Sequence, residues 1–194
     1  YNQAARGRFF VPDDVSLNRD LRGLRLMGID PGLIDTGYGI IDISGNKIFL
    51  VEAGLVRTTK NASLESRLKE IYEGITSVIK EHSPSAVIVE DLYTNYRYPR
   101  TAVLMGHARG VILLAASHNC LSVTSYPPAR VKKALTGTGR ATKTQIQRMV
   151  QVRLGLDRVP EPDHIADALA LALCHYDCFA HALDLKSKDE EVRK

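Results

Sequence analysis

The sequence predicts an α/β domain built on a mixed five-stranded sheet with helices on its faces. Three strand-like segments follow one another before the first helical pattern, which indicates an antiparallel meander. Helix-like and strand-like segments then alternate, which indicates parallel strands joined by right-handed crossovers. The length of 194 residues, with 44% hydrophobic and 25% charged residues, suits one globular domain of this kind.

The first strand pattern covers residues 24–30 and ends in a carboxylate, Asp30, just before Pro31 and Gly32. An acid among core-strand residues loses hydration, which hydrogen bonds, a cation or a raised pKa must replace. Asp30 is therefore a candidate functional residue. Because Asp before Pro and Gly also caps turns, both interpretations are open at this point.

A second strand pattern also ends in a carboxylate. The chain after Gly32 predicts, in order, a return strand around 38–41, a third strand over 48–55, an amphipathic helix over 63–82 and an apolar strand over 85–90. The last of these strands ends in Glu90. If it lies parallel to the first strand, Asp30 and Glu90 share the carboxyl edge of the sheet, where such sheets place their chemistry.

The remaining elements bring a third acid and a histidine. They are an apolar helix over 101–118, a strand over 121–126, a short basic helix over 129–135, a helix from about Thr142 and a final helix from about Asp163 to Leu183. His164 and Asp167 are three residues apart in the final helix, so they share one face. A capping or dipole role explains one of the aspartates Asp163 and Asp167, but leaves His164 unexplained.

The ends of the chain are expected to lie outside this domain, which spans residues 24–183. Residues 1–23 show no sustained period and form an extension of unknown order, and residues 184–194 form a charged, frayed tail.

Basic residues gather in one segment. The net charge is +4, yet residues 92–160 hold eleven Lys and Arg against one acid, so this segment carries +10 and the remainder −6. These cations are Arg97, Arg100, Arg109, Arg130, Lys132, Lys133, Arg140, Lys143, Arg148, Arg153 and Arg158. With tyrosines such as Tyr93 nearby, the segment suits nucleic acid, because phosphates supply charge and bases supply faces for stacking. A merely solvated surface usually mixes both signs.

Two strand-end carboxylates and a helix face with an acid and an imidazole make an oxygen-rich site. Mg²⁺ and Mn²⁺ prefer such ligands, and two ions about 4 Å apart can bind the attacking and leaving oxygens of a phosphodiester. Together with the basic segment, this donor set predicts a metal-dependent nuclease.

Composition excludes several other classes. No apolar run approaches membrane-spanning length, and the first 23 residues lack the apolar core of a signal peptide. The three cysteines are too few for a disulfide framework, and Cys174 and Cys178, four residues apart on an apolar helix, are expected in the core. We therefore expect a cytoplasmic protein without membrane contact.

Several motifs occur together and in order over residues 24–176. They are Met27-Gly-Ile-Asp-Pro-Gly32, Thr36-Gly-Tyr-Gly39, Val89-Glu90, Ala108-Arg-Gly110, Tyr126-Pro-Pro-Ala-Arg-Val-Lys132, Thr136-Gly-Thr-Gly139 and His164-Ile-Ala-Asp-Ala-Leu-Ala170. In this respect the sequence resembles the RuvC family of bacterial Holliday-junction resolvases. The resemblance implies an RNase H-like fold and a homodimer that nicks two opposed strands of a four-way DNA junction symmetrically. It also implies a branch-migration motor as a partner.

The resemblance also implies roles for single residues. The implied metal ligands, for Mg²⁺ or a substituting Mn²⁺ with two ions per active site, are Asp30, Glu90, His164 and Asp167. Asp163 is an alternative to His164, and Asp91 beside Glu90 departs from some relatives. Lys132 and Lys143 are expected near the scissile phosphate. The residues expected to contact DNA are Tyr93, Arg100, Arg109, Arg130, Lys133 and Arg140.

Two other functions share features with this sequence. An ATP-binding domain of the actin and sugar-kinase type also opens with Gly-Ile-Asp-X-Gly, but it needs two such domains, and 194 residues hold one. A non-catalytic junction-binding protein of the same fold would lack one of the four ligands, and this chain has them all.

Overall fold

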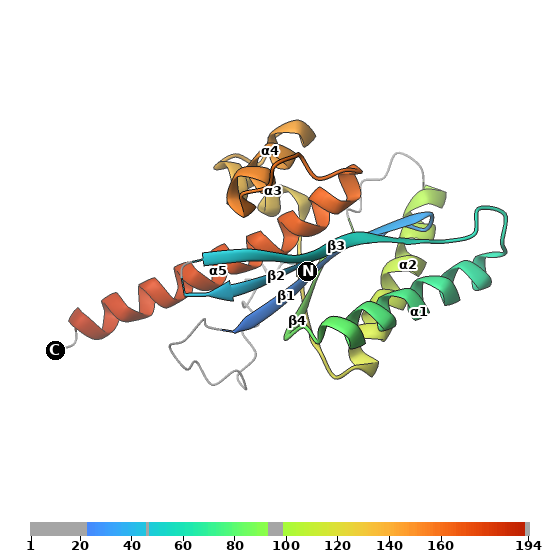
Figure 1. Cartoon of the computed structure of the whole chain (residues 1–194), viewed down its shortest axis with the longest axis horizontal. Helices are drawn as coiled ribbons and strands as arrows, with labels where there is room; N and C mark the ends of the chain where they lie inside the picture. The colour runs from blue at the N-terminus through green and yellow to red at the C-terminus, as the bar shows by residue number, and fades with distance from the viewer. Residues whose placement is uncertain (1–22, 46, 93–98, 193–194) are drawn as a thin grey trace, which may run out of the picture.

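A five-stranded mixed sheet forms the centre of the computed structural model, which describes residues 23–45, 47–92 and 99–192 (Figure 1). The strands are β1 (Leu24–Asp30), β2 (Asp35–Ser44), β3 (Lys47–Arg57), β4 (Ala86–Glu90) and β5 (Ser122–Tyr126), and they lie in the order β3-β2-β1-β4-β5. Antiparallel pairing joins β1, β2 and β3, whereas parallel pairing joins β1 to β4 and β4 to β5. The predicted mixed sheet is confirmed.

Helices cover both faces of this sheet (Figure 1). One face carries α1 (Leu64–His82) and α2 (Pro99–His118), and the other carries α3 (Pro128–Thr136), α4 (Lys143–Leu154) and α5 (Asp163–Val192). Because side chains alternate along a strand, β1 sends Met27 and Ile29 into the core under α1 and α2, and Leu26 into the core under α5. Asp30, four residues after Leu26, therefore points to the α5 side.

Helix α5 is longer than the sequence predicts. The sequence indicates an end at Leu183 and an irregular tail over 184–194, whereas the helix continues to Val192. Residues 184–192 contain no Gly or Pro and include Leu, Lys and Glu, which favour helix, so the helix has no local reason to stop. Of the helices in the described ranges, α5 included, none is long and apolar enough to cross a membrane.

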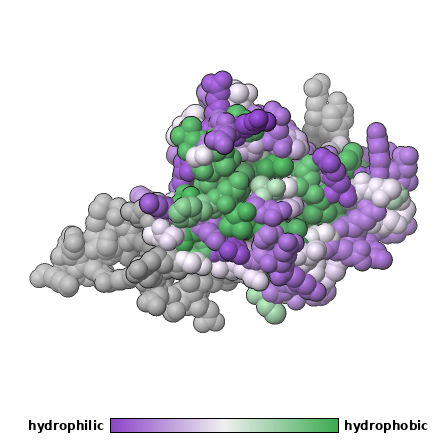
Figure 2. Space-filling view, viewed as in Figure 1, coloured by the Kyte–Doolittle hydropathy of each residue, from purple (hydrophilic) through white to green (hydrophobic). Residues whose placement is uncertain are grey.

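The strand β3 forms one of the two edges of the sheet. Phe49 and Leu50 on this strand and Val152 on α4 are exposed, and α4 contacts β3. Figure 2 shows hydrophobic residues gathered on this side of the molecule, between β3 and the α3–α4 pair. These side chains leave the edge of the sheet apolar.

Glycines let α5 lie close to the sheet. A Cβ atom at Gly28 would lie 1.9 Å from the carbonyl oxygen of Ala168, and one at Gly37 would lie 2.2 Å from the carbonyl oxygen of His164. Any larger residue at either position must push the helix backbone away. The start of α5, which carries the predicted ligands His164 and Asp167, therefore packs directly against the backbone of β1 and β2.

Gly28→Ala should lower the free energy of unfolding by about 2–3 kcal/mol, because the added methyl group meets rigid helix backbone rather than a side chain that can move. Chemical denaturation measures this loss. Gly139→Ala is the matched control: its Cβ would lie 3.4 Å from the nearest atom, so the change should stay below about 0.5 kcal/mol. Equal stability of the two variants would contradict the close approach of α5.

Candidate active site

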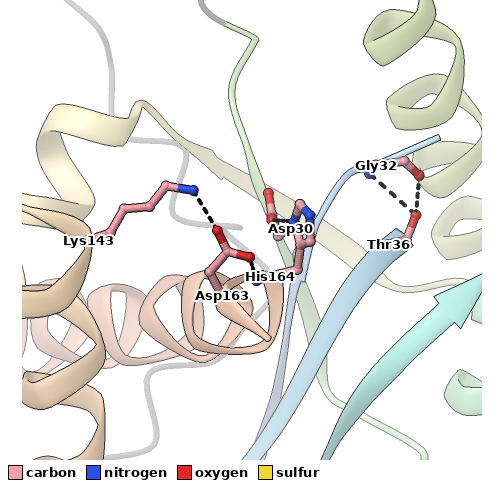
Figure 3. A network of polar contacts seen from close by, with 6 residues as sticks. All are labelled: Asp30, Gly32, Thr36, Lys143, Asp163 and His164. Carbon is pink, nitrogen blue, oxygen red and sulfur yellow. Dashed lines mark hydrogen bonds and ion pairs between the residues drawn. The ribbon is translucent and has the colours of Figure 1, made fainter. Parts of the chain in front are cut away.

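The carboxyl end of β1 and the first turn of α5 meet at Asp30 (Figure 3). Asp30 is only 8% exposed, and its Oδ2 lies 2.7 Å from Nδ1 of His164. Since β1 and β4 are parallel neighbours with Ile29 opposite Val89, Glu90 leaves β4 beside Asp30. The structure thus brings together predicted ligands from three separate elements.

The four predicted ligands share one electrostatic environment. Burial, followed by the negative charges of Asp30 and Asp167, raises the pKa of Glu90 to about 7. Burial, followed by the charge of Asp30, raises the pKa of Asp167 to about 6. The hydrogen bond to Asp30 raises the pKa of His164. Carboxylates therefore crowd one half-buried space, where a proton or a cation is needed to balance their charge.

This donor set fits a hard divalent cation. Carboxylate oxygens with one imidazole nitrogen suit Mg²⁺ or Mn²⁺, and a cation relieves the repulsion among the carboxylates. Within the described part of the chain, no three His, Cys, Asp or Glu side chains are already grouped to hold an ion. The hydrogen bond between His164 and Asp30 uses Nδ1 and Oδ2. It leaves Nε2 of His164 and Oδ1 of Asp30 as donors for an ion.

A second contact separates the roles of His164 and Asp163. Nζ of Lys143 lies 2.7 Å from Oδ2 of Asp163 (Figure 3), whereas His164 faces Asp30. Lys143 is the first residue of α4, and Thr142 caps this helix through a reciprocal capping box. His164 thus contacts Asp30, and Asp163 contacts Lys143.

The two predicted lysines act on different carboxylates. The charge of Lys132, on α3, opposes the larger effects of burial and of the neighbouring acids on the pKa of Glu90. The charge of Lys143 likewise opposes burial and Asp30 in their effects on the pKa of Asp167. Both ammonium groups are therefore close enough to this carboxylate cluster to change its charge.

The side chain of Arg109, which the sequence predicts to contact DNA, turns inward. Its Nε donates to the carbonyl oxygen of Glu90 at 3.0 Å, and its Nη2 donates to Ser125 Oγ at 2.7 Å and to Asp91 Oδ1 at 3.2 Å. Only 19% of the side chain is exposed. The guanidinium of Arg109 therefore supports the backbone at Glu90 and pairs with the neighbouring Asp91, and its contact with DNA stays a prediction.

The other predicted DNA-binding residues divide into two groups. Those that the structure describes are exposed, namely Arg100 at the start of α2, Arg130 and Lys133 on α3, and Arg140 before α4. Tyr93 lies outside the described residues. Its stacking role is therefore a prediction from the resemblance alone.

Sequence reasoning missed the side chains that fix the loop after β1. The hydroxyl of Thr36 donates to the carbonyl oxygen of Gly32 at 2.7 Å (Figure 3). Thr58 Oγ1 and Arg67 Nη2 donate to the carbonyl oxygen of Leu33 at 2.7 and 2.8 Å. The contact between Gly32 and Thr36 has a local signal, the Gly-x-x-x-Thr spacing. Thr58 and Arg67 are distant from Leu33 in sequence and meet it only in the folded chain.

The fold and this site define an RNase H-like α/β domain with a carboxylate-rich donor set at the ends of two parallel strands. Residues 26–175 match the family model described as Crossover junction endodeoxyribonuclease RuvC. The chain belongs to this family.

Relatives that are also described as Crossover junction endodeoxyribonuclease RuvC are similar in sequence over most of the chain. The protein of Rhodopirellula baltica is 48% identical over 152 residues, which are 78% of this chain and 85% of the relative. That of Pelotomaculum thermopropionicum is 45% identical over 163 residues, or 84% and 99% of the two chains. The structure of Thermus thermophilus RuvC matches with a TM-score of 0.76 at 34% identity, covering 82% of this chain and 98% of that one. The T. thermophilus RuvC structure in complex with Holliday junction substrate matches with a TM-score of 0.77 at 35% identity, covering 82% and 97%.

Proposed function

We propose that the chain is a divalent-metal-dependent endodeoxyribonuclease that resolves four-way DNA junctions in recombination and repair. One observation carries this proposal: Asp30, Glu90, His164 and Asp167 share one end of the sheet and one electrostatic environment. The names of the relatives and the junction bound to the T. thermophilus protein support it.

We propose Mg²⁺ as the metal, with two ions per active site and Mn²⁺ able to replace it. Asp30, Glu90, His164 and Asp167 would hold the ions, and when bound these supply Lewis-acid activation of the scissile phosphate. Asp30 occupies the central place, because it contacts His164 and its charge acts on both Glu90 and Asp167.

Lys132 and Lys143 supply positive charge beside the carboxylates. Negative charge builds up on phosphate oxygens during phosphodiester cleavage, and a fixed ammonium group stabilises it. Asp163 limits the freedom of Lys143 through the 2.7 Å ion pair, so the ammonium is held at the start of α4. We propose that the exposed Arg100, Arg130, Lys133 and Arg140 bind flanking phosphates, and that Tyr93 stacks on a base.

A synthetic four-way junction, labelled on two opposed strands, tests this function. With Mg²⁺ or Mn²⁺, the protein should produce paired nicks at symmetric positions, and the products should be ligatable. EDTA should stop the reaction, and a linear duplex of the same sequence should be cut far more slowly. Binding without nicks in every metal tested would favour the alternative of a non-catalytic junction-binding protein.

His164→Ala should slow cleavage by about 10²-fold or more, while Asp163→Ala should slow it less than about tenfold, because only the first removes a proposed ligand. The comparison uses cleavage rates at saturating protein and a series of Mn²⁺ concentrations. His164→Ala should also raise the metal concentration needed for half-maximal rate, whereas Asp163→Ala should leave it unchanged. The reverse order of effects would identify Asp163 as the ligand.

We propose that two copies form a symmetric dimer across α2. Its exposed residues include Val103, His107, Gly110 and Leu114, at spacings of four, three and four, which fall on one helix face. Val103 and Leu114 are 58% and 48% exposed, so this face leaves large apolar side chains uncovered in the described chain. A twofold dimer matches a junction whose opposed strands are also related by a twofold axis.

Leu114→Glu should convert the dimer to a monomer and uncouple the paired nicks, because two like charges would face each other across the twofold axis. Sedimentation velocity measures the oligomeric state, and a cruciform plasmid measures paired against single nicks. Val152→Glu is the matched control, since Val152 is 74% exposed on α4 and away from α2. A Leu114→Glu protein that stays dimeric would exclude this interface.

The junction substrate also bears on one partner and on the location of the protein. We propose that a branch-migration motor works on the same junction, and that the protein acts in the cytoplasm, where bacterial DNA lies. Co-sedimentation of this protein with such a motor on a junction would test the first of these.

A further inference from the structure

Helix α5 carries two thiols one turn apart, well away from the carboxylates. Cys174 is completely buried, whereas Cys178 is half-buried and reaches the edge of the core. Cys178 lies eleven residues beyond Asp167 in the same helix, which places it about 16 Å from the candidate active site. The surroundings of Cys178 are therefore separate from the metal ligands.

The sulfur of Cys178 faces a cation. Nη2 of Arg130, on α3, donates to Sγ of Cys178 at 3.3 Å across the contact between α3 and α5. The hydrogen bond from Cys174 lowers the pKa of Cys178; burial opposes this effect, and Arg130 and the hydroxyl of Tyr126 add to it. The neighbouring His175 has a pKa lowered by burial, and its Nδ1 lies 3.0 Å from the Tyr126 hydroxyl. The groups around Cys178 thus favour its ionised form.

We propose that Cys178 is a modification site, a thiolate held by Arg130 that hydroperoxides oxidise to a sulfenic acid. The thiolate, and not the thiol, is the nucleophile in this reaction. Its sulfur attacks one peroxide oxygen, so that an S–O bond forms as the O–O bond breaks. The released hydroxide or alkoxide takes a proton from solvent. Sulfur loses two electrons and keeps one peroxide oxygen, and the other oxygen leaves as water from hydrogen peroxide or as an alcohol from an alkyl hydroperoxide.

The three cysteines differ in the two properties that this reaction needs. Cys174 is 0% exposed and is not accessible to a peroxide. Cys120 is exposed, so access does not limit it, and it serves as the internal reference. Cys178 combines partial access with the guanidinium of Arg130. Arg130 and Lys132 are two residues apart on α3. The thiol of Cys178 therefore lies in the contact between α5 and the helix that carries Lys132, a proposed catalytic residue.

Competitive labelling of the full chain tests this site. The protein is treated with limiting hydrogen peroxide at pH 6, sulfenic acid is trapped with dimedone, and mass spectrometry compares the peptides of Cys178 and Cys120. Cys178 should be trapped at least about tenfold faster than the more exposed Cys120. Equal or faster trapping at Cys120 would overturn the proposal.

Two variants show whether Arg130 is responsible. Arg130→Gln should slow trapping at Cys178 at least about fivefold and leave Cys120 unchanged. Lys133→Gln is the matched control, because it removes an exposed cation from the same helix. An unchanged rate at Cys178 in Arg130→Gln would refute the role of the guanidinium. This readout needs neither DNA nor metal, so it is independent of whether the chain cleaves junctions.

Discussion

Asp30→Asn should reduce the rate of junction cleavage by about 10³-fold or more, the largest effect expected for any single change in the protein. Asn keeps the shape of the side chain and can still accept a hydrogen bond from Nδ1 of His164, which lies 2.7 Å from Asp30 Oδ2. The substitution removes the negative charge that the metal needs. Folding and junction affinity should therefore survive while cleavage is lost.

Single-turnover cleavage and a binding titration on the same junction measure this prediction. Asp35→Asn provides a matched control, because Asp35 also lies at this end of the sheet but pairs with the exposed Arg57 at 3.4 Å. Its cleavage rate should stay within about twofold of the parent. If Asp30→Asn cleaved as fast as the parent, Asp30 would not be a metal ligand.

Glu90→Gln should also reduce the rate of junction cleavage, by about 10²-fold or more. The same change should stabilise the metal-free protein at neutral pH and above. Folding raises the pKa of Glu90 from 4.5 to about 7, so the folded state favours the protonated acid. The parent protein therefore loses stability as pH rises through this window, by up to about 3 kcal/mol above pH 7. Gln carries no such charge and avoids the loss.

Unfolding by urea in EDTA, at pH 5 and at pH 8, measures the second half of this prediction. The variant should exceed the parent by about 2–3 kcal/mol at pH 8, and the difference should shrink towards pH 5, where Glu90 is mostly protonated in the folded state. Metal should reverse the order at pH 8, because it stabilises only the parent through Glu90. If the variant were less stable than the metal-free parent at pH 8, the folded state would not raise the pKa of Glu90.

The sequence predicts those parts of the structure that have a local signal. Periodicity and the two strand-end acids indicate the mixed sheet and the position of Asp30 beside Glu90 because alternation and crossover rules act within short segments. The spacing of His164 and Asp167 likewise places both on one face of α5. The structure confirms this arrangement.

What the sequence does not reveal depends on contacts between distant segments. Arg109 counts as one more cation in a basic segment, and only the folded chain shows its guanidinium on the carbonyl oxygen of Glu90. The ion pair between Lys143 and Asp163 joins two helices, so no spacing within the sequence reveals it. The sequence likewise indicates only a strand at Gly37, and the close approach of α5 to this residue appears only in the folded chain.

Mn²⁺ binding, followed by electron paramagnetic resonance, tests most directly whether Asp30 anchors a divalent-metal site. At pH 8 the protein should bind about two Mn²⁺ ions per chain. Occupancy should fall towards pH 6, because protons compete for Glu90 and Asp167, whose pKa values are about 7 and about 6 in the metal-free protein. Asp30→Asn should lose most of this binding. If Asp30→Asn bound as much Mn²⁺ as the parent, Asp30 would not be a ligand of this site.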